Sequence, residues 1–202
     1  MRFLRLFPFL VLGSVAAYAI PTTLTVTDYS FDTNPSPLYP DNGTKLTDGV
    51  AYVPVWPDPS VNTSALVGWE NFDYVTVHFN FGQEVTLNSA SFYFADSDGS
   101  AGVYYPSNLV VHTDDFSYTQ GAAPGNPPGS GTTVPFTFSF DSVTTDHIDL
   151  TFTPDGNWNM MSEATFSGTS AVPEPSTYAA IAGALALGFA AWRRRLAAVP
   201  AP

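Results

Sequence analysis

The sequence lacks cysteine, and its central part is almost without basic residues. The absence of cysteine excludes disulfides, cysteine nucleophiles and thiolate metal sites, so the hydrophobic core alone must stabilise the fold. Between residues 20 and 172 there are seventeen acidic residues but a single basic one, Lys45. A surface of this charge repels phosphate groups, which excludes nucleic-acid binding through a basic patch and argues against nucleotide chemistry.

The signatures of common catalytic sites are also absent. There is no Gly-x-Ser-x-Gly elbow, no His-Glu-x-x-His pair and no phosphate-binding loop. His78, His112 and His147 lie within strand-like patterns, and His78 and His147 fall on the polar faces, where a solvent-facing residue is commoner than a catalyst. Carboxylates are abundant, so a glycosidase-like pair stays open as an alternative, although most acidic side chains form a solvated surface.

The first nineteen residues have the three parts of a secretory signal in order. Arg2 and Arg5 form a basic start, residues 6–17 are apolar, and Ala17 and Ala19 supply the small side chains that signal peptidase requires. We therefore expect an N-terminal signal helix over this segment, cleavage directly after Ala19 and export of the body. The alternative is a retained anchor or a buried helix.

The C-terminal end carries a second addressing segment. The motif Pro173, Glu174, Pro175 precedes an apolar run that ends at residue 192, and a basic cluster follows it, formed by Arg193, Arg194 and Arg195. As a helix, the fifteen apolar residues would be about 22 Å long, somewhat short of a full bilayer core. We predict a transmembrane helix over 177–192 whose arginines stay cytoplasmic by the positive-inside rule. Taken by itself, the segment reads as a plain membrane anchor.

This order of motif, apolar span and basic cluster resembles the PEP-CTERM sorting tail of exported Gram-negative bacterial proteins. The resemblance covers residues 172–202 and implies that the chain is an exosortase substrate. It further implies that the tail holds the protein in the inner membrane until processing, after which the body moves to the cell surface or exopolysaccharide matrix. A similar tail occurs in some ice-binding proteins, but a sorting signal does not transfer that activity to this body.

The body, residues 20–171, has the alternation of apolar and polar residues that is typical of half-buried antiparallel strands. Pro, Gly, Asn and Asp separate these segments, and no helical period of useful length precedes residue 176. The pattern predicts an all-β fold, a two-sheet antiparallel sandwich of the jelly-roll type. The candidate strands are 22–31, 50–56, 74–81, 90–95, 103–105, 108–113, 135–140, 147–153 and 160–167.

Three short motifs in the body are similar to those of a known sandwich family. Residues 45–49 read Lys-Leu-Thr-Asp-Gly, residues 79–82 end a strand with Phe-Asn-Phe-Gly, and residues 161–166 read Met-Ser-Glu-Ala-Thr-Phe. Together they resemble the galactose-binding-like jelly roll of discoidin domains and several carbohydrate-binding modules. The resemblance implies that the first and last strands lie together.

The same resemblance implies a structural calcium ion. Its ligands would be Asp48, backbone carbonyls around Leu46, and Glu163. Oxygen-rich, acidic loops suit calcium, which is a hard cation. From the residues alone, an alternative stays open in which Asp48 forms a turn before glycine and Glu163 is a surface acid at the end of a strand.

Sugar binding would require an exposed aromatic platform with a few polar groups beside it. The best candidates are Trp56, Tyr104 and Tyr105, and the alternative is that these rings cap the ends of the sandwich. We predict an exported, non-enzymatic envelope or matrix protein with a glycan-binding or structural role, whose partners are signal peptidase, exosortase, the inner membrane transiently, and a glycan. The alternatives are a small surface carbohydrate-active hydrolase with paired carboxylates, and a structural protein without a specific ligand.

Overall fold

The computed structural model of the chain describes residues 22–51, 63–97, 100–114, 116–120, 133–170 and 175–197. The described part is mostly antiparallel β structure, which confirms the predicted fold class. In chain order the elements are β1 (Thr22–Leu24), β2 (Asp28–Phe31), the 3-10 turn η1 (Thr63–Ala65), β3 (Val67–Glu70), β4 (Val75–Ala95), the 3-10 turn η2 (Ser100–Gly102), β5 (Asn108–His112), β6 (Ser117–Gln120), β7 (Thr133–Thr153), β8 (Trp158–Ser170) and α1 (Pro175–Ala197).

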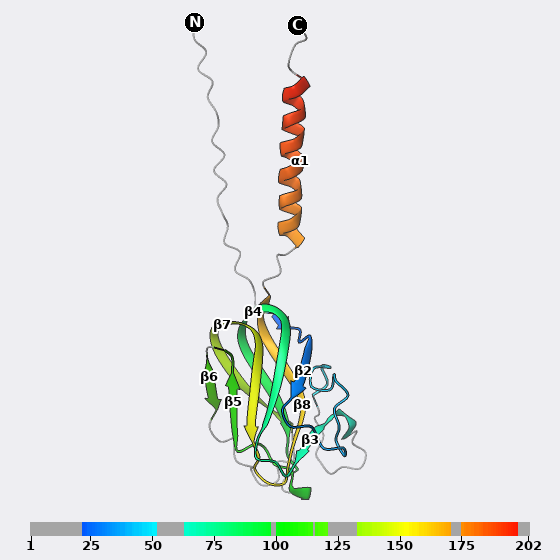
Figure 1. Cartoon of the computed structure of the whole chain (residues 1–202), viewed down its shortest axis with the longest axis vertical. Coiled ribbons are helices and arrows are strands. Elements are labelled where there is room, and N and C mark those ends of the chain that lie inside the picture. The colour runs from blue at the N-terminus through cyan, green and yellow to red at the C-terminus, as the bar shows by residue number, and fades with distance from the viewer. Residues whose placement is uncertain are drawn as a thin grey trace.

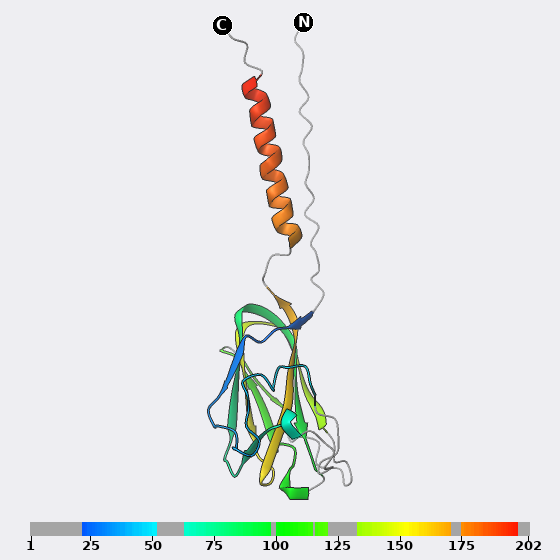
Figure 2. The same cartoon turned by 90° about the vertical axis from the view of Figure 1, so that its right-hand side faces the viewer.

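Strands β4 and β7 are long because each bends over one end of the body and continues on its other side (Figure 1 and Figure 2). Their mutual register shifts between Asn80 and Val85, where Gly82 of β4 has left-handed backbone (φ 71°). It shifts again between Leu87 and Ser89, opposite which Ser142 of β7 has left-handed backbone (φ 58°). Before its bend, β4 pairs with β2 and with the second half of β7. After the bend, it pairs with β8 and with the first half of β7.

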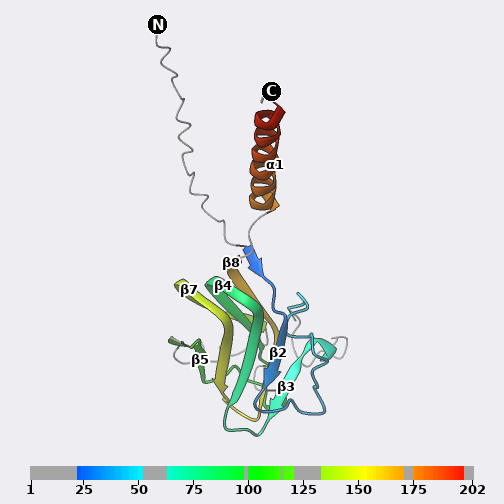
Figure 3. The ribbon, with the colours of Figure 1, turned by 45° about the horizontal axis from the view of Figure 1, so that its top comes forward.

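The remaining strands extend the two resulting sheets. On one side, β5 pairs with the second half of β7 and β6 pairs with β5, so the first sheet runs β2–β4–β7–β5–β6. On the other side, β1 and β3 both pair with β8, which completes the second sheet. The arrangement is a two-sheet antiparallel sandwich of jelly-roll type, as Figure 3 shows from the end at which β4 and β7 bend.

Aromatic side chains fill the space between the two sheets. Phe79, on the first arm of β4, lies 6.0 Å from Phe92 on the second arm and 5.2 Å from Phe166 of β8, measured between ring centroids. All three rings are buried. The predicted alternation over 74–81 is confirmed, because the residues at every second position from Val75 to Phe81 face this core.

Some strand predictions are wrong. Residues 103–105 contain only an isolated bridge between Val103 and Trp158, and residues 50 and 51 belong to no strand, while the rest of 50–56 lies outside the described residues. Strands β3 and β6 were not predicted. In β3 three consecutive residues are buried, so this strand has no period of two for the sequence to reveal.

The first and last strands of the sandwich, β1 and β8, lie side by side. Thr22 of β1 pairs with Gly168 of β8, and Val85, just after the bend of β4, pairs with Ser170. Gly168 has no room for a side chain, because a Cβ there would lie 2.1 Å from the carbonyl oxygen of Thr86. The position therefore favours glycine, and the strand that leads into the C-terminal tail packs closely against β4.

The sequence predicts a transmembrane helix over 177–192, and α1 covers these residues. In the described part of the chain, no helix has both the length and the apolar character that crossing a bilayer requires. Anchoring of the protein through this helix therefore stays a prediction. The predicted signal helix at 1–19 lies outside the described residues.

Candidate functional site

The early loop and the last strand meet in the structure. The amide of Gly49 donates a hydrogen bond of 3.0 Å to Oε2 of Glu163, and the amide of Ala164 donates one of 2.7 Å to the carbonyl of Leu46. Leu46 itself is fully buried in the core. The loop is thus fastened to β8, and the structure brings together two of the three motifs that carry the sequence resemblance, residues 45–49 and 161–166.

The Tyr29 hydroxyl also holds this loop, which the sequence did not indicate. It accepts a hydrogen bond of 3.2 Å from the amide of Leu46 and donates one of 2.7 Å to Oδ1 of Asp41. Burial, together with the negative charges of Asp41 and Asp48, raises the pKa of Tyr29 far above its ordinary value. Tyr29 therefore stays protonated and can serve as both donor and acceptor.

Glu163 is not a surface acid at a strand end. It lies within β8 and is only 3% exposed. Burial raises the pKa of Glu163 to about 7, and the charge of Asp48 adds to this rise, while the hydrogen bond from the Gly49 amide works against it. Asp48 itself is exposed and accepts a hydrogen bond of 2.8 Å from the amide of Val50. A buried carboxylate beside a second carboxylate is stabilised by binding either a proton or a cation.

The donor atoms of this site suit calcium, which takes carboxylate and carbonyl oxygens. Asp48 and Glu163 supply carboxylates, and the Leu46 carbonyl keeps a second lone pair beside its hydrogen bond to Ala164. Among the described residues, no three or more acidic or histidine side chains converge as metal ligands. A calcium ion here would therefore draw most of its 6–8 oxygen ligands from main-chain carbonyls and water.

The aromatic candidates have different environments. Tyr105 is 5% exposed, and its ring centroid lies 5.5 Å from that of Phe136, so the prediction that Tyr105 forms an exposed platform is wrong: its ring packs in the core. Tyr104 is partly exposed, and its ring lies against Gly156, where an added Cβ would lie 2.2 Å from Tyr104 Cδ2. Trp56 lies outside the described residues.

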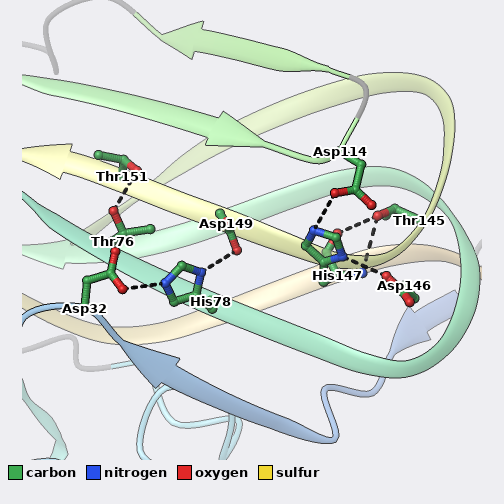
Figure 4. A network of polar contacts seen from close by, with 9 residues as sticks. All are labelled: Asp32, Thr76, His78, Asp114, Thr145, Asp146, His147, Asp149 and Thr151. Atoms are coloured by element: carbon green, nitrogen blue, oxygen red, sulfur yellow. Dashed lines mark hydrogen bonds and ion pairs between the residues drawn. The ribbon is translucent and has the colours of Figure 1, made fainter.

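A histidine–carboxylate network on the outer face of the first sheet was missed by the sequence analysis (Figure 4). Nδ1 of His78 lies 2.8 Å from Oδ1 of Asp149, and its Nε2 lies 3.1 Å from Oδ1 of Asp32. Partial burial by itself lowers the pKa of His78, but the hydrogen bonds and charges of the two aspartates outweigh this effect and raise it. With both ring nitrogens against carboxylates, His78 is held best as the charged imidazolium.

His147, which lies on β7, also has a carboxylate near each ring nitrogen. Its Nδ1 lies 2.7 Å from Oδ1 of Asp146, and its Nε2 lies 3.6 Å from Oδ1 of Asp114. The hydrogen bond to Asp146 raises the pKa of His147, against the smaller effect of burial. The polar-face positions of His78 and His147 were predicted from alternation, but their partners depend on the strand register.

The residues of the predicted tail are only partly described. Pro175 is the first residue of α1, Arg193 and Arg194 are exposed near its end, and Arg195 is also helical. The predicted motif residues Pro173 and Glu174 lie outside the described residues, as do the predicted cleavage residues Ala17 and Ala19.

The comparison with protein families identifies the tail. Residues 171–195 match the PEP-CTERM protein-sorting motif. The predicted sorting tail is thus confirmed. No curated protein matches the chain significantly.

Solved structures similar to this chain include carbohydrate-binding modules. The family 32 module of C. perfringens NanJ in complex with galactose is 13% identical, with a TM-score of 0.47 over 73% of this chain and 99% of that chain. The Streptococcus pneumoniae fucose-binding module SpX-3 is 8% identical, with a TM-score of 0.49 over 72% of this chain and 96% of that chain. The CBM32 of AlyQ in complex with 4,5-unsaturated mannuronic acid is 13% identical, with a TM-score of 0.46 over 72% and 97%.

Proposed function

We propose that this protein is exported, sorted to the cell surface or extracellular matrix of a Gram-negative bacterium, and binds glycans there without catalysing a reaction. The observation that carries the proposal is the PEP-CTERM match at residues 171–195, which begins directly after the last strand of the sandwich. The sandwich has its own aromatic core, so it is suited to act as a binding module once the tail is processed.

The position of Glu163 beside Asp48 supports a non-catalytic role. Glu163 is buried and accepts the Gly49 amide, so its carboxylate does not face a substrate. Both ring nitrogens of His78 are hydrogen-bonded to carboxylates, so His78 has no free nitrogen for proton transfer to a substrate. These placements disfavour the alternative of a hydrolase with paired carboxylates.

The proposal for sorting names signal peptidase, exosortase and the inner membrane as successive partners. Replacing Pro173, Glu174 and Pro175 with alanine should prevent processing and leave the protein in the inner-membrane fraction. Val199→Ala, outside the matched motif, is the control and should be released normally. The measurement is fractionation with an antibody against the sandwich, and normal surface release of the triple variant would refute the proposed sorting.

The proposal for glycan binding is tested with the full chain, solubilised in detergent, on an array of defined oligosaccharides. We expect saturable binding to at least one glycan and no turnover of it. Tyr104→Ala tests whether the partly exposed ring forms a platform, and Tyr74→Ala, at a ring that is 58% exposed elsewhere, is the matched control. An array without any binding rejects the glycan-binding function, and release of sugar products favours the hydrolase instead.

The proposal includes a structural calcium ion at the loop–strand junction. Asp48 and Glu163 would hold it, together with main-chain carbonyls near Leu46, and it would neutralise the two adjacent carboxylates. The observation that supports this proposal is the raised pKa of Glu163, which comes first from burial and then from the charge of Asp48, because a bound cation would counter both effects. Its role would be to fasten the early loop to β8.

A further inference from the structure

The outer face of the first sheet carries all three histidines of the chain. The strand register places Ser30, His78, Asp149, His112 and Ser117 in one row across β2, β4, β7, β5 and β6. Side chains directly opposite on a sheet face are close enough to interact. Two of these contacts are formed at 2.8 Å, one between the His78 ring and the Asp149 carboxylate and one between the His112 ring and the Ser117 hydroxyl.

A cavity of ≈ 410 Å³ lies on this face beside the row, between His78 and His147. Its volume is within the range of roughly 300–1,000 Å³ that is typical of small-ligand sites. Figure 4 shows the two rings on the same face of the sheet with Asp149 between them. The side chains that line the cavity are mainly Asp28, Ser30, His78, Asn80, His147 and Asp149. It is thus lined by carboxylate, imidazole, amide and hydroxyl groups.

These polar groups are held in place before any ligand arrives. The ring of His78 is fixed between two aspartates, and the side-chain oxygen of Asn80 accepts a hydrogen bond of 2.7 Å from the Gly82 amide. The Asn80 amide group points to Oδ2 of Asp28 at 3.4 Å, a long contact that a ligand hydroxyl can replace. Because the residues stand on strands, binding would cost little conformational entropy.

The charge of the cavity selects among ligands. No lysine or arginine is present among its lining residues, whereas Asp28, Asp146 and Asp149 contribute carboxylates. Even when His78 and His147 are protonated, the three carboxylates outnumber the two imidazolium rings, so ligands that carry sulfate, phosphate or uronic acid groups would be repelled. Carboxylates accept hydrogen bonds from hydroxyl groups, and each has two oxygens that can do so. The cavity therefore suits a neutral polyol.

We infer that this cavity is the glycan site of the protein and that it takes a neutral sugar unit through adjacent hydroxyl groups. Asp28 and Asn80, both exposed at its edge, contact the sugar directly, while His78 and Asp149 shape its floor. The inference rests on the proposed glycan-binding function and deepens it. It places recognition on the face of the first sheet instead of on the aromatic residue Tyr104.

The test uses the full chain in detergent on an array of galactose-, glucose- and mannose-based oligosaccharides, with sulfated and uronic-acid counterparts. We expect binding to neutral members only. For the strongest neutral glycan, Asp28→Ala and Asn80→Ala should each weaken the affinity about tenfold, because each removes a ligand hydrogen bond. Asp155→Ala removes a carboxylate that is also exposed but lies outside the cavity, and it should leave the affinity within about twofold.

Each outcome decides between the inference and the function on which it rests. Unchanged affinity in both Asp28→Ala and Asn80→Ala, or a preference for the anionic glycans, overturns the inference while glycan binding itself stands. Loss of binding in Tyr104→Ala alone also overturns the inference while glycan binding stands, and it places the site at the Tyr104 ring. Binding of no glycan overturns both. An unchanged melting midpoint shows that a weakened variant is still folded. Asp28→Asn is a further variant that removes the charge but keeps the size of the side chain.

Discussion

The loop–strand junction and the outer face of the first sheet deal with carboxylates in opposite ways. At the junction, Glu163 is buried against the Gly49 amide and beside Asp48, and burial raises its pKa to about 7. On the sheet face, Asp149 is half-exposed and lies against His78, so here the pKa of the histidine is raised. One site favours a proton or a metal ion on the acid, and the other favours a proton on the base.

The difference follows from the shortage of basic residues. Lys45, the only basic side chain between residues 20 and 172, donates to the carbonyls of Pro40 and Leu66 and so serves the loop backbone. The carboxylates are left with backbone amides, with histidine or with neutral side chains such as Tyr29 and Asn80 as partners. A body built this way has interactions that respond to pH and to cations, because none of these partners carries a fixed positive charge.

The largest expected effect comes from breaking the junction with Leu46→Ala. The side chain of Leu46, a residue of the loop, is fully buried in the core. The substitution therefore leaves a cavity and should lower the free energy of unfolding by about 2–5 kcal/mol. Chemical denaturation measures this change. Leu38→Ala is the control, because Leu38 is 73% exposed, and it should change the stability by less than about 0.5 kcal/mol. Equal effects of the two substitutions would show that the loop is not packed as described.

An intermediate effect is expected from calcium at the same junction. At a calcium concentration one hundred times its dissociation constant, binding should stabilise the folded chain by about 2.7 kcal/mol relative to EDTA. Glu163→Gln should abolish this gain, whereas Glu70→Gln, at an exposed position on β3, should keep it. Thermal melting with calcium and with EDTA is the measurement. An unchanged midpoint of the parent chain rejects the metal.

The smallest effect is expected on the sheet face, from His78→Gln. Because the folded pKa of His78 is raised, its stabilising effect is fully present below the unfolded value of about 6.5 and is lost as the pH rises through the folded value. Since the contact is partly exposed, the substitution should cost less than about 1 kcal/mol at pH 6 and progressively less at higher pH. Urea denaturation from pH 5.5 to 8.5 measures the difference between parent and variant.

His112→Gln is the matched control for this pH dependence. Nδ1 of His112 contacts the Ser117 hydroxyl, which carries no charge, so the substitution should not reproduce the pH-dependent difference. If the difference between the parent chain and His78→Gln stays constant from pH 5.5 to 8.5, the imidazolium bridge between Asp32 and Asp149 does not form.

Much of the fold could be predicted from the sequence because alternation records which face of a strand is buried. The apolar positions of 74–81 all face the core, and His78 lies on the polar face as expected. The bends of β4 and β7 were not predictable from the same pattern. The alternation of apolar and polar residues is seen on each side of the bend, so each bent strand was predicted as two separate short strands.

The sites were less predictable because they join residues that are far apart in the chain. The pairing of His78 with Asp149 spans 71 residues and depends on the β4–β7 register. Tyr105 looked like an exposed ring after an acidic turn, yet it is buried and packs against Phe136. A single sequence carries no signal for either contact.

By itself, the sequence determined the all-β class, the sorting tail and the shortage of basic side chains, because composition, alternation and linear motifs are local properties of the chain. Only the tertiary structure decided that Glu163 is buried beside Asp48 and that three histidines share one sheet face. Burial and proximity arise from packing between distant segments. The pKa of a side chain depends on the charges and the solvent that this packing places around it.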